Sequence, residues 1–235
     1  MADIRLIDDA AGARRVSGLV DEVWGASTPL LGVELVRAIG HAGGYVAAAC
    51  VDDQIVGASL GFLASHHGEL ALHSHVTGVL PSVRATGLGR ALKLHQQAWA
   101  AERGLAWVTW TFDPLVRRNA WFNLRVLGAE VREYLVDFYG PIDDSINARD
   151  ESDRLLVAWA TATSPRDTRQ LEPDAIPAGA LAVPTPGDIV DLRRTDPAAA
   201  AAWRRRIRDE LGGALGTGAR VASFTRSGEY VLEAT

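Results

Sequence analysis

Cysteine is almost absent from this sequence. Cys50 is the only cysteine among 235 residues, so no disulfide can form within the chain and no metal site of several thiolates can be built. Such scarcity is typical of proteins that work in a reducing compartment.

Long apolar runs and an excess of basic residues are also missing. No apolar run approaches the roughly 20 residues that span a bilayer, and the first residues contain no apolar signal-peptide core. The chain has 24 Lys and Arg against 29 Asp and Glu, a net charge of −5. A general polyanion binder needs a basic face instead. We therefore expect a cytoplasmic protein with no membrane and no nucleic-acid partner.

Hydrophobic residues make up 48% of the chain, enough for a substantial core. Over residues 1–160 their spacing predicts the order β-α-α-β-β-β-α-β-α-β-β, a mixed α/β layer. Tyr45–Val51 and Ile55–Leu63 form a predicted hairpin. A helix is expected from Pro29, with Leu31, Leu35 and Ile39 on one stripe, and another over 88–103, with Leu88, Leu92, Ala98 and Trp99.

The remaining residues predict a small second domain. Residues 161–186 are rich in Pro, Thr and Ala without a period, which is typical of a linker. In residues 187–235, Asp196-Pro197 is a helix-start pattern, and Ser227-Gly228 marks the turn of a hairpin. We predict a domain over 1–160, a linker over 161–186 and a small α+β extension over 187–235.

The segment from Val79 to Leu92 is the most informative. A strand ends, a short loop carries Gly87 and Gly89, and an amphipathic helix begins at once. Glycine lets backbone N–H groups approach a ligand, and a helix N-terminus favours an anion. The pattern predicts a seat for a diphosphate; the alternative is an ordinary glycine-containing turn.

The arrangement strand-Pro-x-x-Arg-x-x-Gly-x-Gly resembles motif A of the GNAT acyltransferase superfamily, with Arg84, Gly87 and Gly89 at its defining positions. The element order over 1–160 is similar to that fold too. The resemblance implies a mixed, mostly antiparallel sheet flanked by helices. It also implies an acyl-CoA co-substrate, acetyl-CoA or succinyl-CoA, and no metal.

The same resemblance assigns residues to the cofactor. Backbone N–H groups of the loop would bind the pyrophosphate, and the pantetheine arm would lie along the strand that ends at Val79 and Leu80. The N–H of Val79 or Leu80 would polarise the thioester carbonyl. The expected loop residues are Arg84, Ala85, Thr86, Gly87, Leu88, Gly89 and Arg90.

A narrower resemblance rests on residues 110–115 (Trp-Thr-Phe-Asp-Pro-Leu), Gly128-Ala129, Tyr139-Gly140 and 152–154 (Ser-Asp-Arg). They look like a GNAT subgroup with a C-terminal extension. Some of its members are encoded beside N-succinylamino acid racemases and are linked to succinylation of amino acids.

The chain departs from the superfamily at the general acid. Many members carry a tyrosine on the helix after the fifth strand, but that position is Leu124 here, and the usual asparagine is Arg117. The usual acid is therefore absent or supplied from elsewhere. Tyr139 is preferred over Tyr134 as a replacement, and the reaction without an acid stays open because a thiolate is a tolerable leaving group.

His73 and His75 are the candidates for a general base, because residues two apart in a strand point to one face and histidine titrates near neutral pH. The alternatives are a packed or surface pair, or a zinc pair that lacks an evident third ligand. Removing a proton at pH 7 costs about 4.6 kcal/mol for a lysine amine but about 1.4 for a peptide α-amine. An α-amine acceptor is therefore favoured over a protein lysine.

Other polar residues each allow a functional and a structural interpretation. Asn119 and Asn123 share a helix face and would bind CoA or the acceptor, or would be caps. Arg154 would bind an acceptor carboxylate, or form an ion pair. The run from Arg204 to Arg208 is read as a solvated helix face, with an anionic partner as the alternative.

The leading hypothesis is an N-acyltransferase that moves an acetyl or succinyl group to the amine of a small molecule, such as an amino acid, by direct attack. The alternatives are a non-catalytic acyl-CoA sensor and a protein-modifying acetyltransferase. A homodimer is left open.

Overall fold

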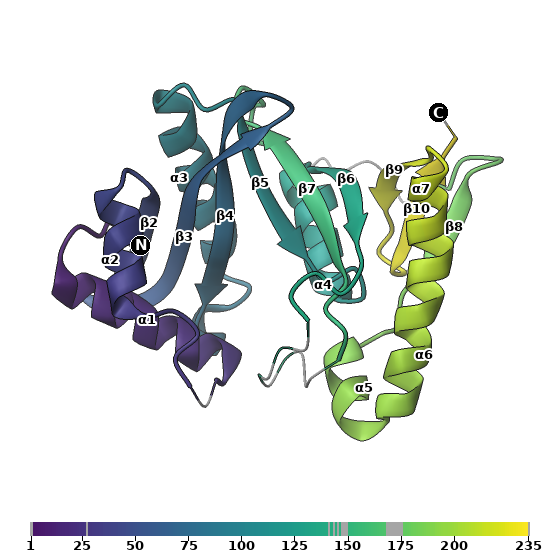
Figure 1. The fold of residues 1–235 in the computed structure, drawn as a ribbon, viewed down its shortest axis with the longest axis horizontal. Helices are drawn as coiled ribbons and strands as arrows, with labels where there is room; N and C mark the ends of the chain where they lie inside the picture. Colours follow the sequence, from purple (N-terminus) through teal and green to yellow (C-terminus); the bar gives the residue numbers. More distant parts are fainter. Residues whose placement is uncertain are drawn as a thin grey trace. The chain divides into compact units, whose positions relative to one another are not determined.

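In the computed structural model, the described residues are 2–26, 28–140, 142, 144, 146, 150–167 and 176–234. The chain divides into two compact units (Figure 1). The first comprises Met1–Trp110 with Ala160–Thr163, and the second Thr111–Trp159 with Ser164–Thr235. The domain boundaries expected from the sequence stay a prediction.

The sheet of the first unit is mostly antiparallel. Its strands follow one another in chain order, each antiparallel to the next until β5, which is parallel to β4. The predicted hairpin around Asp52 and Asp53 is confirmed as β2 and β3. The strands are β1 (Asp3–Leu6), β2 (Tyr45–Val51), β3 (Gln54–His66), β4 (Glu69–Val79) and β5 (Trp107–Phe112), whose last two residues belong to the second unit.

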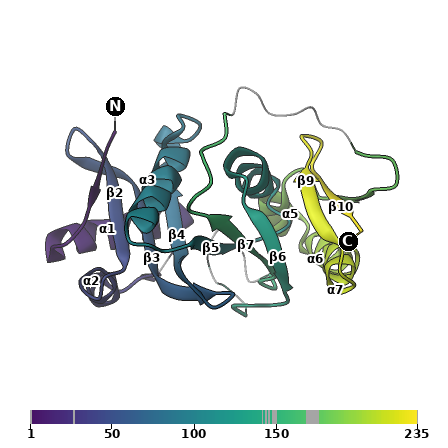
Figure 2. The same cartoon turned by 90° about the horizontal axis from the view of Figure 1, so that it is seen from above.

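Helices cover both faces of this sheet (Figure 2). They are α1 (Ala10–Trp24), α2 (Val33–His41) and α3 (Leu88–Glu102), and the 3-10 turn η1 (Pro81–Val83) precedes α3. Ala48 and Cys50 of β2 pack in one cluster with α1 and α2. Ala49, between them, packs against Leu92 of α3. Alternate residues of β2 therefore contact opposite layers of helix.

Two helical stripes differ from the sequence prediction. Helix α2 begins at Val33 with Gly32 as its N-cap, so Leu31 precedes the helix. Leu31 and Ile39 belong to the core cluster as expected, but Leu35 does not. Val36 is buried, whereas Leu35 is 52% exposed. In α3 Ala98 is exposed, and Gln96 occupies a core position.

The second unit contains two groups of strands and six short helical segments in the part that is described. Strand β6 (Glu130–Leu135) is antiparallel to β7 (Arg154–Ala160), and β8, β10 and β9 form a separate antiparallel sheet in that order. The other elements are α4 (Arg117–Ala120), η2 (Trp121–Leu127), β8 (Leu181–Pro184), α5 (Ile189–Thr195), α6 (Pro197–Ile207), η4 (Arg208–Gly212), α7 (Gly213–Gly216), β9 (Arg220–Phe224) and β10 (Glu229–Glu233).

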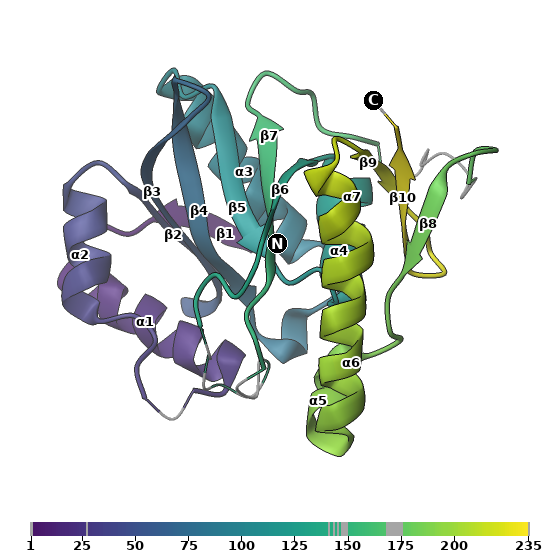
Figure 3. The same ribbon diagram turned by 45° about the vertical axis from the view of Figure 1, so that its right-hand side comes forward.

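The C-terminal extension contains the expected elements. The Asp196 carboxylate accepts a hydrogen bond from the Ala199 N–H and caps α6, and β9 and β10 form the terminal hairpin. Figure 3 shows α6 continuing into α7 beside the three strands. The sequence prediction missed strand β8, which lies inside the predicted linker. Residues 168–175 of that linker lie outside the described residues.

The predicted class, a mixed and mostly antiparallel sheet flanked by helices, is confirmed. In the described ranges, every helix is too short or too polar to cross a bilayer.

Candidate active site

The glycine loop leads into the N-terminus of α3. Gly87 caps the helix with φ of 88°, a left-handed conformation that favours glycine. The Thr86 hydroxyl donates a hydrogen bond to the Val83 carbonyl at 2.8 Å. A bond from the Ala91 N–H to the Gly87 carbonyl begins the helical ladder. The backbone N–H groups of residues 88–90 precede that bond and lie at the positive end of the helix.

This loop suits an anion. The first turn of α3 contains no acidic residue. A Cβ atom added to Gly87 or to Gly89 would meet no other atom within 4 Å, so the space beside the backbone is open. The exposed Arg84 adds positive charge nearby in the chain. The expected loop residues 84–90 are thus brought together around one helix start, and their role in binding CoA stays a prediction.

Strands β4 and β5 pair over a short distance and then part. Their pairs are Ala71 with Trp107, Leu72 with Val108, and His73 with Thr109. His73 Nδ1 and Thr109 Oγ1 are hydrogen-bonded at 3.1 Å on this last pair. Strand β4 continues six residues further, to Val79. Among the described residues no β4–β5 pair follows, so the edge of β4 beyond His73 is not paired with β5.

The two predicted oxyanion amides differ. The Leu80 N–H already donates to the Val56 carbonyl at 2.9 Å. It is therefore occupied by a protein acceptor. Val79 remains the predicted donor to a thioester carbonyl.

His75 is the extra residue of a β-bulge. Gly61 of β3 pairs with Ser74 and Leu60 pairs with Val76, which leaves His75 between them without a partner in β3. The rings of His73 and His75 lie 5.2 Å and 5.9 Å from the ring of Phe62. The shared face expected for the two histidines is therefore present. Bulges often redirect a side chain near a functional site.

Both histidines are held in the neutral form. Burial lowers the pKa of His73 to about 4, with smaller contributions from His75 and Lys93. Burial also lowers the pKa of His75. Within the described ranges, no three His, Cys, Asp or Glu residues are grouped so that they could hold a metal ion.

A buried polar cluster lies behind the bulge and was missed from the sequence. Lys93 of α3 is 3% exposed, and burial lowers its pKa to about 7. Its Nζ donates to Ser74 Oγ and to Gln96 Oε1, both at 3.0 Å, and lies 3.7 Å from the centre of the Trp110 ring. Gln96 follows Leu88 and Leu92 at four-residue steps and therefore lies on the buried face of the helix. This spacing was the signal in the sequence that the helix buries polar residues.

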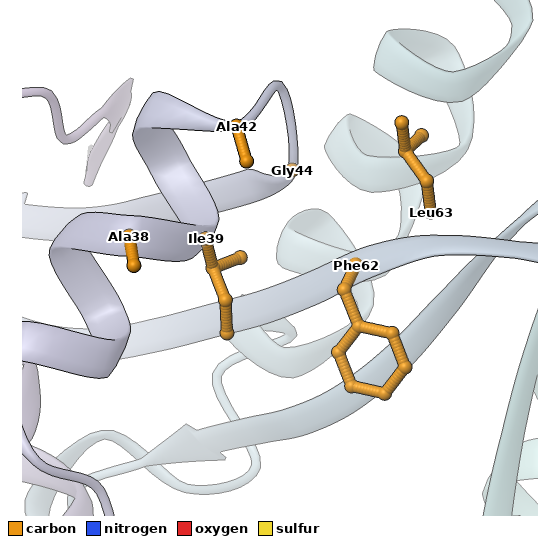
Figure 4. A pocket seen from close by; sticks show the side chains of 6 residues that line it. All are labelled: Ala38, Ile39, Ala42, Gly44, Phe62 and Leu63. Carbon is orange, nitrogen blue, oxygen red and sulfur yellow. The ribbon is translucent and has the colours of Figure 1, made fainter.

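An apolar pocket shares Phe62 with the histidines. Its volume is about 300 Å³, and it opens between the end of α2 and β3 (Figure 4). The lining residues are Ala38, Ile39, Ala42, Gly44, Phe62 and Leu63. Phe62 therefore contacts both an apolar surface and the two imidazole rings.

The remaining predicted site residues belong to the second unit. Tyr139 is 43% exposed, and its hydroxyl is 3.1 Å from Thr111 Oγ1. Leu124, which stands where the usual tyrosine is expected, is buried, and so is Asn123, while Asn119 is half-buried. Their roles stay predictions.

Arg154 belongs to a buried ion cluster around Asp113. It lies 3.8 Å from the Asp113 carboxylate, which also contacts Arg193 at 2.5 Å and Arg204 at 2.9 Å. The ion pair considered for Arg154 is therefore present, and binding of an acceptor carboxylate stays a prediction. The solvated face expected for the arginine run is wrong for Arg204, which is 1% exposed.

No protein-family model matches the chain, and no curated protein matches its sequence. Its fold, in contrast, matches known structures. A protein of Desulfovibrio desulfuricans described as an acetyltransferase of the GNAT family has 21% identity and a TM-score of 0.54, over 69% of this chain and 100% of its own. The ribosomal-protein-S18-alanine N-acetyltransferase of Escherichia coli has 13% identity and a TM-score of 0.55, over 71% and 98%.

An aminoglycoside 6'-N-acetyltransferase complexed with coenzyme A has 16% identity and a TM-score of 0.51, over 70% of this chain and 99% of its own. At such identities the similarity shows the fold. This chain has the fold of GNAT acetyltransferases, which confirms the general resemblance. The narrower subgroup stays a prediction.

Proposed function

We propose that this protein is an acyl-CoA-dependent N-acyltransferase that acylates the amine of a small molecule. The observation that carries the proposal is the course of β4. This strand bulges at His75, runs beyond its last pair with β5, and leads through an open glycine loop into the N-terminus of α3. The proposed anion seat and the two neutral histidines thus belong to one continuous segment of the chain.

The loop would hold the diphosphate of CoA. Backbone N–H groups at the start of α3 bind the anion, and the open space beside Gly87 and Gly89 lets the ligand approach. The N–H of Val79 orients the acyl carbonyl. CoA, when bound, supplies the acyl group as an activated thioester.

His75 is the better proton acceptor of the pair. Moving a proton from an α-ammonium, whose pKa at a peptide N-terminus is about 8, to an imidazole with a pKa of about 4 costs about 5 kcal/mol. That cost applies to His73. His75 is the more exposed of the two, so it accepts the proton of the attacking amine. His73, bonded to Thr109, stays neutral and does not repel a cationic acceptor.

The acceptor is a small amine with an apolar part. The pocket around Phe62 is lined by apolar residues, and Phe62 contacts both imidazole rings. An apolar side chain in that pocket would leave an α-amine facing the histidines. The transferred group is acetyl or succinyl, and the resemblance of residues 110–115 to the succinylating subgroup supports an amino acid acceptor.

Release of free thiol tests the proposal. The purified protein is given acetyl-CoA or succinyl-CoA with a panel of apolar amino acids, and the new thiol is measured. We expect turnover with at least one pair, lost in His75→Ala. Saturable CoA binding without turnover would favour the acyl-CoA sensor instead. Turnover only with a peptide N-terminus would favour a protein-modifying enzyme.

Two glycines of the same helix provide a matched test of the CoA seat. Gly87 precedes α3 and Gly104 follows it; both have positive φ, 88° and 69°, with no atom within 4 Å of an added Cβ. Valine at either position should cost about 1–2 kcal/mol of stability. Only Gly87→Val should weaken CoA binding, by about tenfold or more. Equal affinity of the two variants in calorimetry would contradict the proposed seat.

A further inference from the structure

The bulge in β4 is held from both sides by side chains. Ser74 directly precedes His75, and its hydroxyl accepts a hydrogen bond from Lys93 Nζ. Thr77 lies two residues after His75, and its hydroxyl is 2.8 Å from Ser59 Oγ in β3. Ser74 adjoins the only position of the β3–β4 ladder, within the described residues, where the register shifts, and Thr77 lies one pair beyond it.

The two sides are connected through α3. Lys93 donates to Gln96 Oε1 at 3.0 Å, and Gln96 Nε2 donates to Ser59 Oγ at 3.1 Å. An unbroken series of hydrogen bonds therefore runs from one side of the bulge to the other. Its members, called the polar clamp below, are Ser74, Lys93, Gln96, Ser59 and Thr77.

We propose that Lys93 and Gln96 are positioning residues that hold the β4 bulge, and with it His75, in the geometry that the reaction uses. The inference rests on the proposed function for the role of His75. The clamp itself can be tested without any substrate.

Burial makes a role in stability alone a poor explanation of the clamp. Ser59 and Gln96 are fully buried, and Lys93 and Ser74 nearly so. Among the described residues no carboxylate forms an ion pair with Lys93, so its charge is compensated only by neutral oxygens and by the Trp110 ring. Apolar residues of similar volume would be cheaper to bury. What the polar residues provide is directed hydrogen bonding at a point where the bulge interrupts the backbone ladder.

The clamp also acts on His73 through charge. The groups recognised as lowering the pKa of His73, besides burial, are His75 on the same strand and Lys93 on α3. Lys93 thus discourages a proton on the histidine next to the bulge. This electrostatic effect and the hydrogen bonding can be separated by mutation.

Hydrogen exchange of the β4 amides tests the clamp with a matched control. Gln96 and Gln97 are neighbouring buried residues of one helix, but Gln97 donates to the carbonyls of Ala160 and Thr163, outside the clamp. We expect Gln96→Leu to accelerate exchange at residues 74–77 by about tenfold, the equivalent of one buried hydrogen bond. Gln97→Leu should leave those amides unchanged. Equal protection of residues 74–77 in the two variants overturns the proposal.

Substitutions of Lys93 separate position from charge. Lys93→Gln keeps polar atoms beside Ser74 and Gln96, whereas Lys93→Met removes them. We expect Lys93→Met alone to accelerate exchange at residues 74–77. Both variants should raise the pKa of His73, followed by NMR of its ring, by about half a unit or more.

If Lys93→Met leaves both the exchange and the His73 pKa unchanged, Lys93 is not a positioning residue. The proposed function would then stand or fall separately, on thiol release by the unmodified protein. Conversely, a protein that shows the exchange pattern but no thiol release retains the clamp and loses the acyltransfer.

Discussion

The two units bury charge in opposite ways. In the first unit Lys93 is compensated by a serine, a glutamine and an indole ring. In the second unit the Asp113 carboxylate is surrounded by three guanidinium groups, of Arg154, Arg193 and Arg204. Arg193 and Arg204 also contact Asp150.

The pKa directions show the difference. Burial alone would raise the pKa of Asp113, but Arg204 and Arg193 more than reverse this and hold it below its usual value. Burial lowers the pKa of Lys93 to about 7, with no opposing contribution. The ionised form of Asp113 in the second unit is therefore stabilised by its neighbours, whereas the charged form of Lys93 in the first unit is destabilised by burial. A buried lysine that lowers stability and lies beside the proposed site is more readily explained by function than by stability.

The largest effect is expected from Asp113→Ala. Removing this carboxylate leaves Arg193 and Arg204 buried with Asp150 as their remaining ion-pair partner among the described residues, and should lower the free energy of unfolding by about 3–5 kcal/mol. The surface pair of Asp191 with Arg194 is the control, and Asp191→Ala should cost less than about 1 kcal/mol. Denaturant titration measures both. If the two variants lose similar stability, the Asp113 cluster does not make the large contribution to stability that its burial indicates.

Lys93→Met should raise the free energy of unfolding instead of lowering it, and the size of this increase should depend on pH. The folded-state pKa of Lys93, about 7, lies below that of the unfolded chain, about 10.4. The folded protein therefore disfavours the proton, and the wild type gains stability as the pH rises from 7 toward 10. Below pH 7 the variant should be more stable by up to about 5 kcal/mol, less the two lost hydrogen bonds. Unfolding at several pH values would contradict this if the difference stayed constant.

A smaller effect separates two tyrosines of the second unit. Tyr134 donates to the Asp153 carboxylate at 2.6 Å, whereas Tyr139 is exposed and contacts Thr111. Because a hydrogen bond to an ionised group is stronger, Tyr134→Phe should cost about 1–2 kcal/mol. Tyr139→Phe should cost less than about 0.5 kcal/mol. Denaturation midpoints that rank the pair in the reverse order would show that Asp153 is satisfied by Arg208 and the Asp137 N–H without Tyr134.

Local patterns in the sequence predicted the elements well. The turn at Asp52-Asp53 fixed a hairpin, and Asp196-Pro197 fixed a helix start, because the hydrogen bonds of both are made within a few residues. The glycine loop was found for the same reason.

Partners distant in the chain were not predictable. Arg204 was read as solvated because its neighbours in sequence are arginines, yet its partner Asp113 is 91 residues away. Lys93 went unnoticed because a lysine within a helix is normally exposed. Only the packing of α3 on β3 and β4 places Lys93 between Ser74 and Gln96.

The sequence by itself determined the order of elements, the loop at residues 79–90 and the two-residue spacing of His73 and His75, because each depends on contacts within one segment. The tertiary structure decided where β4 leaves β5, that His75 occupies a bulge, and which charges are buried. Register shifts and buried pairs depend on the packing of segments distant in the chain, and no local pattern encodes that packing.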